Sequence, residues 1–419
     1  MTELNAAAKQ LSPYGIYTCR GCHASGLTSV LDLGVQPLAN ELLHSADAPD
    51  ADFPLHLRIC PSCGLGQVGE FVRPERIFSD YPYLSSVSLS WLAHAKRYAV
   101  AITEEFQLAE VNGLVVEVAS NDGYLLREFI ELGVPVLGVE PAANVAEIAR
   151  TSGVRTLTAF FGRDTARSIV VEHGHPRLVV ANNVLAHVPD LDDFVGGLAE
   201  LADKHTVITV ENPSFVTLLN ETQFDTIYHE HFSYLSAHAV ALVVARQGLE
   251  LVKIDELSTH GGSYRYTIVR HGARKAERSV AATIERELEH GLLSPLNWVA
   301  FADRSRRTIA GLRAWLDERV LRGEHVAAYG AAAKGNTLLN AAHTQAADIV
   351  AVADGSAEKQ GKYLPGSRVP VVVPGALADT EASDVLILPW NIADEIAPLI
   401  RNLKPEARIW TAVPSMQVL

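Results

Sequence analysis

The sequence contains few cysteines, no excess of basic residues and no long apolar run. Its 419 residues include four cysteines, and 49 acidic side chains outnumber 35 basic ones to give a net charge of −14. Proteins that hold nucleic acid through its phosphates usually carry a basic field, so this balance argues against such a partner. No run of about 18 apolar residues could span a bilayer, and the first residues, MTELNAAAKQ, lack the pattern of a signal peptide. We therefore expect a cytoplasmic protein without a membrane or nucleic-acid partner.

The remaining composition is that of a folded protein with more than one domain. Apolar residues make up 48% of the chain and charged residues 20%, which are ordinary values for globular proteins and argue against wholesale disorder. At roughly 100–200 residues per domain, a chain of this length holds two to four domains. We expect three.

All four cysteines fall in two closely spaced pairs. TCRGC contains Cys19 and Cys22, and ICPSC contains Cys60 and Cys63. Two CxxC turns in one short segment are typical of a tetrahedral zinc site, because each turn directs two sulfurs toward one ion. A redox CxxC or two disulfides would fit the spacing as well, but a reducing cytosol disfavours both. Four thiolates leave zinc no open position, so we expect a structural ion that stabilises a segment with little core of its own.

From residue 113 onward, apolar strand patterns alternate with amphipathic helix patterns. The strands are GLVVEVAS (113–120), VPVLGVE, RLVVANN and HTVITVEN. Alternation of this kind predicts a doubly wound parallel sheet. Long charged helices follow between about residues 274 and 322, and then HVAAYGAAAKGNTLLNAA, DIVAVADGS and ASDVLILPWN restart the alternation. We therefore expect a second, smaller α/β sheet in the C-terminal part of the chain.

The segment VVEVASNDGYLL has the form of a cofactor-binding loop. It is a strand that ends in a tight turn and opens a helix, and Glu140 ends the next strand about 20 residues later. This spacing places Glu140 where it can accept hydrogen bonds from both hydroxyls of a ribose. A dinucleotide would favour glycine at Ala119 and Asn121, to make room for a pyrophosphate. Because the loop is acidic instead, we expect S-adenosylmethionine, with its ammonium and sulfonium groups, rather than NAD.

A second candidate site is DTIYHEHFSYLS (225–236), where His229 and His231 flank Glu230. The stretch follows the strand HTVITVEN, at the carboxyl rim where open α/β sheets bind ligands. A metal site would require all three side chains to converge, although in an extended segment Glu230 points the other way. Acid/base chemistry requires one imidazole oriented by its neighbours, and a histidine with a pKa of about 6.5 suits proton abstraction near neutral pH. The residues alone leave both interpretations open.

A third stretch, GAAAKGNT (330–337), imitates a phosphate-binding loop. Asn336 stands where a Walker motif requires lysine directly after its last glycine. We therefore reject nucleotide hydrolysis, and we expect the C-terminal sheet to hold part of a substrate or to serve as a docking surface.

Eight strings taken together resemble the three-domain, zinc-containing sugar C-methyltransferases, which methylate nucleotide-linked keto-deoxysugars. They are the two cysteine pairs, LGVQPLANELL, DYPYLSS, VEVASNDGYLL, ANNVLAHVPDL, YHEHFSYLS, HGGSYR and KQGKYLPG with LPWN, in order over essentially the whole chain. The resemblance implies an α/β protein with a zinc-binding domain at 1–75, a class I, Rossmann-like methyltransferase domain at 76–272, and a helical connector with a second Rossmann-like domain at 273–419.

The resemblance also implies roles for particular residues. The cofactor site would include Glu117, Ala119, Asn121, Gly123, Glu140, Phe161, Asn182 and Asn183. The substrate site would include Tyr83, His187, His260 and Ser263. The family string Tyr-x-Glu-His would supply the catalytic residues Tyr228, Glu230 and His231, with His229 as a bystander. Phe161 could equally be a plain core aromatic, and the HGGSYR segment an ordinary turn.

The chemistry implied is transfer of a methyl group to the carbon beside the ketone of a nucleotide-linked 4-keto-deoxysugar. That carbon becomes nucleophilic when a base removes its hydrogen and the enolate is stabilised, so His231 would act as the base, Tyr228 would donate to the enolate oxygen, and Glu230 would orient the imidazole. Two alternatives remain at this stage. One is methylation of another carbonyl-activated small molecule, and the other is a zinc-stabilised binding protein without activity.

Overall fold

The computed structural model describes residues 17–79 and 84–419. Its contacts divide the chain into two compact units, each assembled from segments far apart in the sequence. Within the described residues, the first unit consists of 17–27, Cys60–Phe215 and Phe232–Leu293. The second unit consists of Thr28–Ile59, Val216–His231 and Ser294–Leu419. Residues 28–59, between the two cysteine pairs, therefore cluster with the C-terminal part of the chain.

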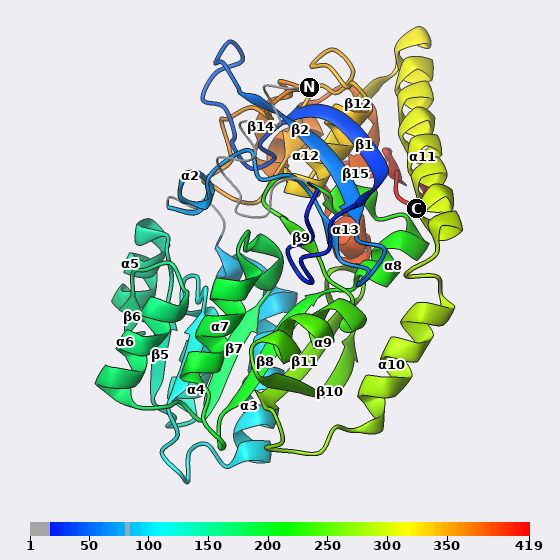
Figure 1. Cartoon of the computed structure of the whole chain (residues 1–419). Helices are drawn as coiled ribbons and strands as arrows, with labels where there is room; N and C mark the ends of the chain where they lie inside the picture. The colour runs from blue at the N-terminus through cyan, green and yellow to red at the C-terminus, as the bar shows by residue number, and fades with distance from the viewer. Residues whose placement is uncertain (1–16, 80–83) are drawn as a thin grey trace. The chain divides into compact units, whose positions relative to one another are not determined.

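The first unit is built on a seven-stranded sheet with the order β10-β11-β8-β7-β4-β5-β6 (Figure 1). The five strands from β8 to β6 run parallel, and β11 and β10 add an antiparallel edge. The strands are β4 (Val115–Val118), β5 (Val136–Val139), β6 (Thr156–Leu157), β7 (Leu178–Asn182), β8 (Val207–Pro213), β10 (Leu249–Leu257) and β11 (Ser263–Arg270). Their apolar runs are those of strands buried on both faces, which confirms the predicted parallel sheet.

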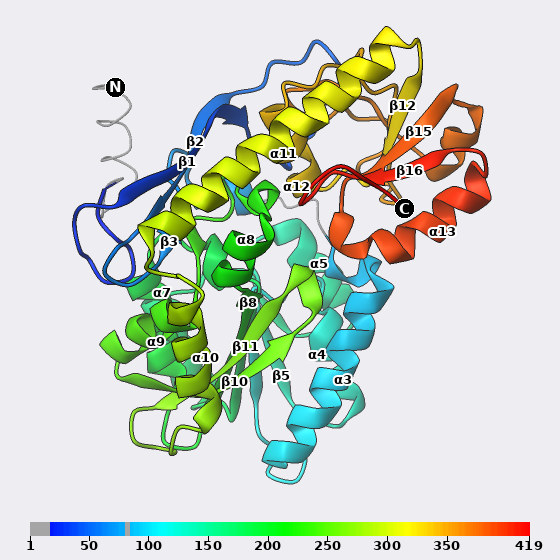
Figure 2. The same cartoon turned by 90° about the vertical axis from the view of Figure 1, so that its right-hand side faces the viewer.

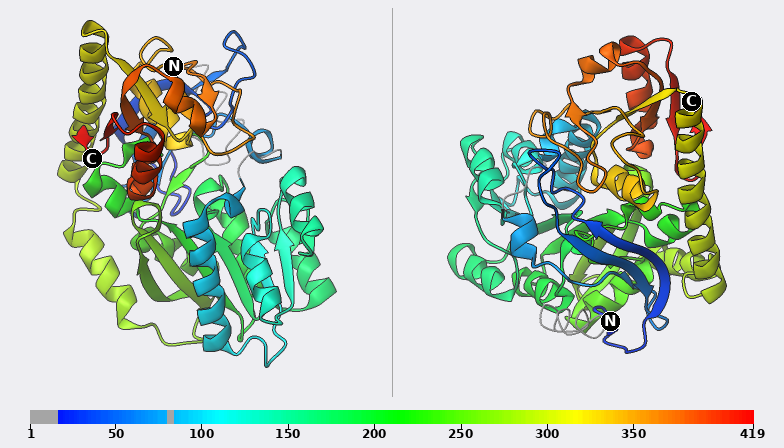
Figure 3. Two further views of the ribbon diagram at one scale, coloured as in Figure 1. Left: turned by 180° about the vertical axis from the view of Figure 1, so that it is seen from behind. Right: turned by 90° about the horizontal axis from the view of Figure 1, so that it is seen from above.

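Helices cover both faces of this sheet. Figure 3, left, shows the face that carries α3 and α4. One face packs against α3 (Leu89–Phe106), α4 (Tyr124–Glu131) and α5 (Ala143–Thr151). The other packs against α6 (Arg163–His173), α7 (Leu191–Leu201) and α9 (Ala237–Arg246), and α10 (Arg278–Glu289) packs on α9 and β10. Short elements complete the unit: β3 (Gly66–Gln67) paired with β9 (Ser233–Tyr234), α2 (Pro74–Phe78), η1 (Ser85–Val87), η2 (Leu185–His187) and η4 (Thr259–Gly261).

The alternation of side chains along the strands determines which polar groups share a face. The apolar side chains beneath α3 and α4 include Val115, Leu178 and Val207. Side chains two or four positions further along a strand point to the same face. Glu117, Asn182 and Glu211 therefore face α3 and α4 at the carboxyl ends of the three neighbouring strands β4, β7 and β8.

The second unit contains a six-stranded sheet with the order β14-β13-β12-β15-β16-β17 (Figure 2). All neighbours are parallel except β16 and β17. The strands are β12 (His325–Tyr329), β13 (Val352–Ala353), β14 (Val371–Val372), β15 (Ala382–Ile387), β16 (Arg408–Thr411) and β17 (Gln417–Val418). From β12 the chain adds β13 and β14 on one side of that strand, and it then returns to add β15 and β16 on its other side. The strand order therefore reverses between β12 and β15. The predicted second Rossmann-like sheet is confirmed.

Helices and one hairpin surround this second sheet. The helices are α8 (Phe215–Glu221), η3 (Phe224–Thr226), α11 (Pro295–Leu321), α12 (Ala333–Ala341), η5 (Pro374–Asp379), η6 (Trp390–Ile392) and α13 (Ala393–Leu403). The hairpin consists of β1 (Thr28–Pro37) and β2 (Asp52–Ile59), which pair antiparallel with two irregularities in register. Strand β1 contacts both α11 and α12.

No helix within the described residues is both long and apolar enough to cross a membrane.

Candidate functional site

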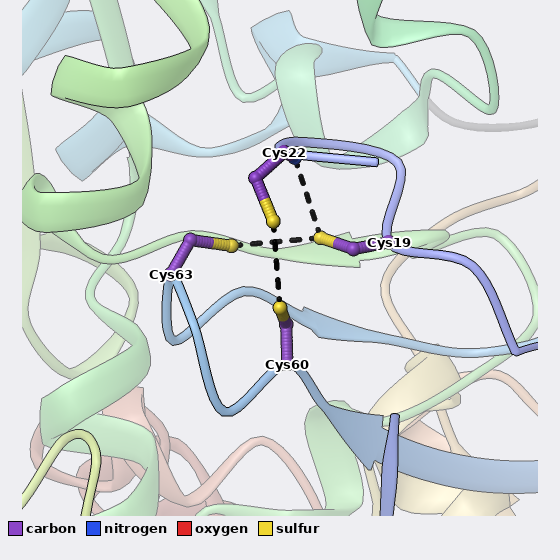
Figure 4. Close-up of side chains that lie close together, drawn as sticks. All are labelled: Cys19, Cys22, Cys60 and Cys63. Carbon is purple, nitrogen blue, oxygen red and sulfur yellow. Dashed lines mark hydrogen bonds between the residues drawn. The ribbon is translucent and has the colours of Figure 1, made fainter. Parts of the chain in front are cut away.

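The four cysteine side chains converge on one point in the first unit (Figure 4). The sulfurs of Cys19 and Cys63 are 3.5 Å apart, as are those of Cys22 and Cys60, and all four lie within 4.8 Å of one another. A disulfide would require about 2.05 Å, whereas sulfurs held about 2.3 Å from a tetrahedral zinc ion are roughly 3.8 Å apart. The arrangement therefore fits a zinc ion with four sulfur ligands and excludes disulfides.

The surroundings of these thiols also favour a bound cation. Cys19, Cys60 and Cys63 are buried in the same hydrophobic cluster as α9 and the inner strands of the sheet. Hydrogen bonds from the neighbouring thiols, together with burial, raise the pKa of Cys63 well above its ordinary value. Four thiolates at this spacing would repel one another, and a dication, which deprotonates the thiols that it binds, would offset that repulsion.

The loop between β4 and α4 has the backbone that a cofactor-binding turn requires. Ala119 has a φ of 56°, Asn121 a φ of 51° and Gly123 a φ of 77°. Side chains rarely adopt this left-handed region, so Ala119 and Asn121 are held in strained conformations at the two positions where a dinucleotide-binding loop would carry glycine. A Cβ on Gly123 would lie 2.8 Å from the side chain of Val154. The backbone of this turn therefore packs closely against the side chain of Val154, and glycine at position 123 makes that approach possible.

Glu140 and Glu117 make the loop acidic from two adjacent strands. The carboxylate of Glu140 accepts hydrogen bonds from the backbone N–H groups of Asn121 and Ala142, both at 2.9 Å. Burial, and then the charges of Asp122 and Glu140, raise the pKa of Glu117 well above its usual value. A cationic ligand would favour the ionised carboxylate.

Three buried oxygens at this place test whether S-adenosylmethionine fits. Among the described residues, Oε2 of Glu117, Oδ1 of Asp122 and Oδ1 of Asn182 have no hydrogen-bond partner. A buried acceptor without a donor is costly, and the ammonium group of the cofactor supplies three donors. The acceptors that remain unsatisfied in the protein are therefore ones that the ammonium group of this cofactor can satisfy.

The other predicted cofactor residues lie nearby in the same unit. Asn183 has a φ of 52°, and its backbone N–H donates to the carbonyl of Glu211 at 2.7 Å. Phe161 packs edge to face on Phe194 of α7, with ring centroids 5.3 Å apart, and is half-buried. Asn183 thus stands at the carboxyl end of β7, whereas Phe161 makes the contact of a core aromatic.

The sequence reasoning missed a polar cluster on the α3 and α4 face. The carboxylate of Glu211 lies 3.0 Å from Nε2 of His94 and accepts a hydrogen bond from Nε of Arg265 at 2.6 Å. Burial by itself would raise the pKa of Glu211, but the contacts with His94 and Arg265 hold that pKa below its ordinary value. Trp91 stacks on His94 and on His260, with centroids 5.0 and 5.1 Å apart. The string HGGSYR, which the sequence singled out, contains His260 and Arg265 of this cluster.

The predicted substrate residues occupy separate places. His187, in η2, packs edge to face on Phe78 at 5.4 Å. His260 has a φ of 56° and stacks on Trp91. The hydroxyl of Ser263 donates to the carbonyl of Thr259 at 2.9 Å, which is a local turn contact. Tyr83 lies outside the described residues.

In the second unit, a tight turn joins Tyr228 and His231. The backbone N–H of His231 donates to the carbonyl of Tyr228, so the two side chains lie side by side with ring centroids 4.1 Å apart. The hydroxyl of Tyr228 is 2.9 Å from Nε2 of His231, and Nδ1 of His231 is 3.0 Å from the carbonyl oxygen of Thr226. Because a carbonyl only accepts, Nδ1 carries the proton and Nε2 is the basic nitrogen facing the phenol.

The neighbours of this pair have other contacts. Both carboxylate oxygens of Glu230 lie 2.8 Å from the amide nitrogen of Asn40, which donates to them. Nε2 of His229 donates to the carbonyl of Phe53 at 3.2 Å. Among the described residues, the grouping with metal-binding geometry is the one made by the four cysteines. Tyr228 and His231 are therefore paired with each other, while Glu230 and His229 contact Asn40 and Phe53. Asn40 lies within LGVQPLANELL, a string that carried the family resemblance but was not assigned to the site.

The chain is similar to known protein families along most of its length. Three family models match it in order: a zinc binding domain at residues 19–78, a methyltransferase domain at 91–254 and a C-methyltransferase C-terminal domain at 258–414. The C-methyltransferase NovU of Streptomyces niveus is 35% identical over 381 residues, which cover 90% of each chain. This chain belongs to the C-methyltransferase family. It is an S-adenosylmethionine-dependent enzyme with a zinc-binding domain, and the alternative of a binding protein without activity is set aside.

Two solved structures resemble this C-methyltransferase over less than half of its length. The magnesium protoporphyrin IX methyltransferase of Synechocystis PCC 6803 with bound SAH is 14% identical, covers 43% of this chain and 83% of its own, and has a TM-score of 0.33. The PH0226 protein of Pyrococcus horikoshii OT3 is 13% identical, covers 47% and 97%, and has a TM-score of 0.37. The family assignment rests on the sequence relative.

The position of Glu140 in this C-methyltransferase leads to a prediction for cofactor affinity. We expect Glu140→Ala to weaken S-adenosylmethionine binding about tenfold to a hundredfold, because charge-assisted hydrogen bonds to the ribose are worth roughly 1.5–3 kcal/mol. Titration calorimetry measures the dissociation constant. Glu147→Ala is the matched control, since Glu147 is an exposed carboxylate on α5 that pairs with Arg150. Equal affinity in both variants would contradict the role.

The burial of His229 leads to a prediction for stability. Burial lowers its pKa to about 4 from 6.5, so the folded enzyme holds it neutral. Below pH 6.5 the unfolded chain takes up a proton on His229, whereas the folded chain does so only near pH 4. The free energy of unfolding is therefore at its full value above pH 6.5 and falls as the pH drops toward 4. His229→Gln can still donate to Phe53 but does not titrate, so its urea midpoint should fall less between about pH 7.5 and pH 5 than that of the wild type.

Tryptophan fluorescence follows this unfolding, since Trp298, Trp315, Trp390 and Trp410 belong to the second unit. His44→Gln, at an exposed histidine of the same unit, should keep the pH dependence of the wild type. An identical pH dependence in His229→Gln would show that His229 is not held neutral.

Proposed function

We propose that the enzyme methylates the carbon adjacent to the ketone of a nucleotide-linked 4-keto-deoxysugar. The observation that carries the proposal is the Tyr228 and His231 pair, in which the imidazole keeps its basic Nε2 2.9 Å from a phenolic hydroxyl. A carbon beside a ketone becomes nucleophilic only when a base takes its proton and a donor stabilises the enolate. An imidazole and a phenol held together supply both functions.

Nε2 of His231 accepts the proton from the substrate carbon, and the electron pair left behind passes into the enolate. When bound, S-adenosylmethionine would supply an electrophilic methyl group: the enolate carbon would bond to this methyl as the sulfur–methyl bond breaks, with the electrons of that bond left on sulfur. The hydroxyl of Tyr228 donates to the developing enolate oxygen. Glu230 keeps the turn in place through its contact with Asn40 and adds negative charge that favours the imidazolium.

Residues of the first unit bind the methyl donor in this proposal. Glu140 accepts from the ribose, while the unsatisfied oxygens of Glu117, Asp122 and Asn182 receive the ammonium group. Tyr83, His187, His260 and Ser263 are assigned to the sugar and its phosphates by resemblance to the family. A cytoplasmic location is part of the same proposal, because a site of four free cysteines suits a reducing compartment.

The test is to incubate the enzyme with methyl-labelled S-adenosylmethionine and two panels of acceptors. One panel holds nucleotide-linked 4-keto-deoxysugars with different bases, and the other holds carbonyl compounds that carry no sugar. We expect label in the sugar, at the carbon next to the ketone. Label found only in the second panel would replace the sugar by another carbonyl-activated substrate.

A further inference from the structure

Asp225 is a buried carboxylate that lies three residues before the turn formed by Tyr228 and His231. It lies in η3, is completely buried, and accepts a hydrogen bond at 2.7 Å from the indole N–H of Trp390. Its second oxygen has no hydrogen-bond partner among the described residues. Burial raises the pKa of Asp225 to about 6, and the charge of Lys334 opposes that rise. The next residue, Thr226, supplies the carbonyl that holds the imidazole of His231.

Lys334 brings the counter-charge from the GAAAKGNT stretch. It lies in the first turn of α12, which packs against η3, and its ammonium donates to the amide oxygen of Asn391 at 2.7 Å. The same ammonium is 5.0 Å from the centroid of the Trp390 ring. A cation in the first turn of a helix is opposed by the helix dipole, so a negative partner is needed to keep it there. Burial lowers the pKa of Lys334, and the charge of Asp225 opposes that lowering.

The place of this cluster in the sheet is informative. Lys334 follows β12, and Trp390 and Asn391 follow β15, the two parallel neighbours between which the strand order reverses. In open α/β sheets the carboxyl ends of such strands form a crevice that binds a ligand. Here Trp390 donates instead to Asp225 of η3, a segment of the same chain, and the charge of Lys334 acts on the same carboxylate.

We propose that Asp225, Trp390 and Lys334 are positioning residues that fix the tautomer of His231. They hold η3 so that the carbonyl of Thr226 accepts from Nδ1, which leaves Nε2 as the basic nitrogen beside Tyr228. This inference rests on the proposed function, in which His231 is the base. It gives a role to the GAAAKGNT stretch that does not involve a phosphate, and it follows the general rule that outer partners orient a reactive imidazole.

The direct test is the imidazole tautomer, read from nitrogen chemical shifts of histidine-labelled full-length enzyme. The His231 signals are assigned by their loss in His231→Asn. We expect the wild type to hold the proton on Nδ1, and Trp390→Phe and Asp225→Asn to show a mixture of both tautomers. Lys334→Arg keeps the charge and should keep the wild-type tautomer, whereas Lys334→Met should not. An unchanged tautomer in both Trp390→Phe and Asp225→Asn would overturn the inference.

Kinetics then separate the inference from the function on which it rests. With the cofactor's dissociation constant unchanged, kcat in Trp390→Phe should fall about tenfold to a hundredfold, together with exchange of the substrate's acidic hydrogen for solvent deuterium. The control is Lys404→Met, which removes a lysine of the same unit whose ammonium bonds the carbonyl of Thr380. Full turnover in Lys404→Met supports the inference. A tautomer change without any loss of exchange would refute His231 as the base while leaving the positioning contact established.

Discussion

His231→Asn should lower turnover by roughly 10²–10⁴-fold, the range typical of a general base. Asparagine keeps the approximate shape of the side chain but lacks the basic nitrogen, so the substrate carbon cannot lose its proton to it. Cofactor affinity should stay at its wild-type value, because the residues assigned to the cofactor belong to the first unit. Steady-state kinetics measure the first quantity and calorimetry the second.

A second measurement isolates the proton transfer from the methyl transfer. With the demethylated cofactor bound, the acidic hydrogen of the sugar should exchange with solvent deuterium in the wild type and much more slowly in His231→Asn. Glu230→Gln should reduce both rates moderately, while His229→Asn should change them little. Near-normal turnover in His231→Asn with loss in His229→Asn would mean that the other imidazole is the base. Activity restored by a divalent metal would return the stretch to the metal interpretation.

Cys60→Ser should cause the largest loss of stability. A structural zinc ion contributes an apparent binding free energy of about 10–16 kcal/mol in small zinc domains, and losing one of four ligands forfeits a large part of it. Three of the cysteines lie in the same buried cluster as α9 and the sheet of the first unit. We therefore expect a lower unfolding midpoint for that whole unit, with β3, β9 and α9 the first segments to lose protection from hydrogen exchange.

Elemental analysis supplies the stoichiometry, which should be one zinc per wild-type chain and less in Cys60→Ser. The matched control is Ser62→Ala, an exposed position in the same turn that leaves all four sulfurs in place. Any Cys60→Ser protein that remains folded should bind S-adenosylmethionine with ordinary affinity, because the cysteines form no part of the cofactor loop. Well-folded wild-type protein without zinc would refute the assignment.

Features encoded by local pattern were predictable from the sequence. The strand after residue 113 and the helix after Gly123 follow from an apolar run and a turn, and the structure has β4 and α4 there. The sequence marked positions 119 and 121 as those where a dinucleotide-binding loop would carry glycine, and both have positive φ angles. The cysteine spacing likewise indicated the convergence of the four sulfurs, because a CxxC turn fixes its own geometry.

Features that depend on partners distant in the sequence were not predictable. His94, Glu211 and Arg265 belong to a helix and two strands, and none carries a local mark of the ion pair that they form. The partner of Glu230 is Asn40, which is 190 residues away along the chain. Such contacts are selected by packing of the finished fold, and a single sequence records them only as ordinary polar residues.

The discontinuous second unit has a consequence for synthesis on the ribosome. The β1–β2 hairpin ends at Ile59, whereas its partner helix α12 begins at Ala333. At about 5–20 residues per second, the roughly 270 residues between them take about 14–55 s to translate. During that interval the side chains of Leu31, Leu55 and Leu57, buried in the finished protein, lack part of their final cover. The nascent chain therefore presents an apolar hairpin to chaperones, and slower translation of its second half lengthens that exposure.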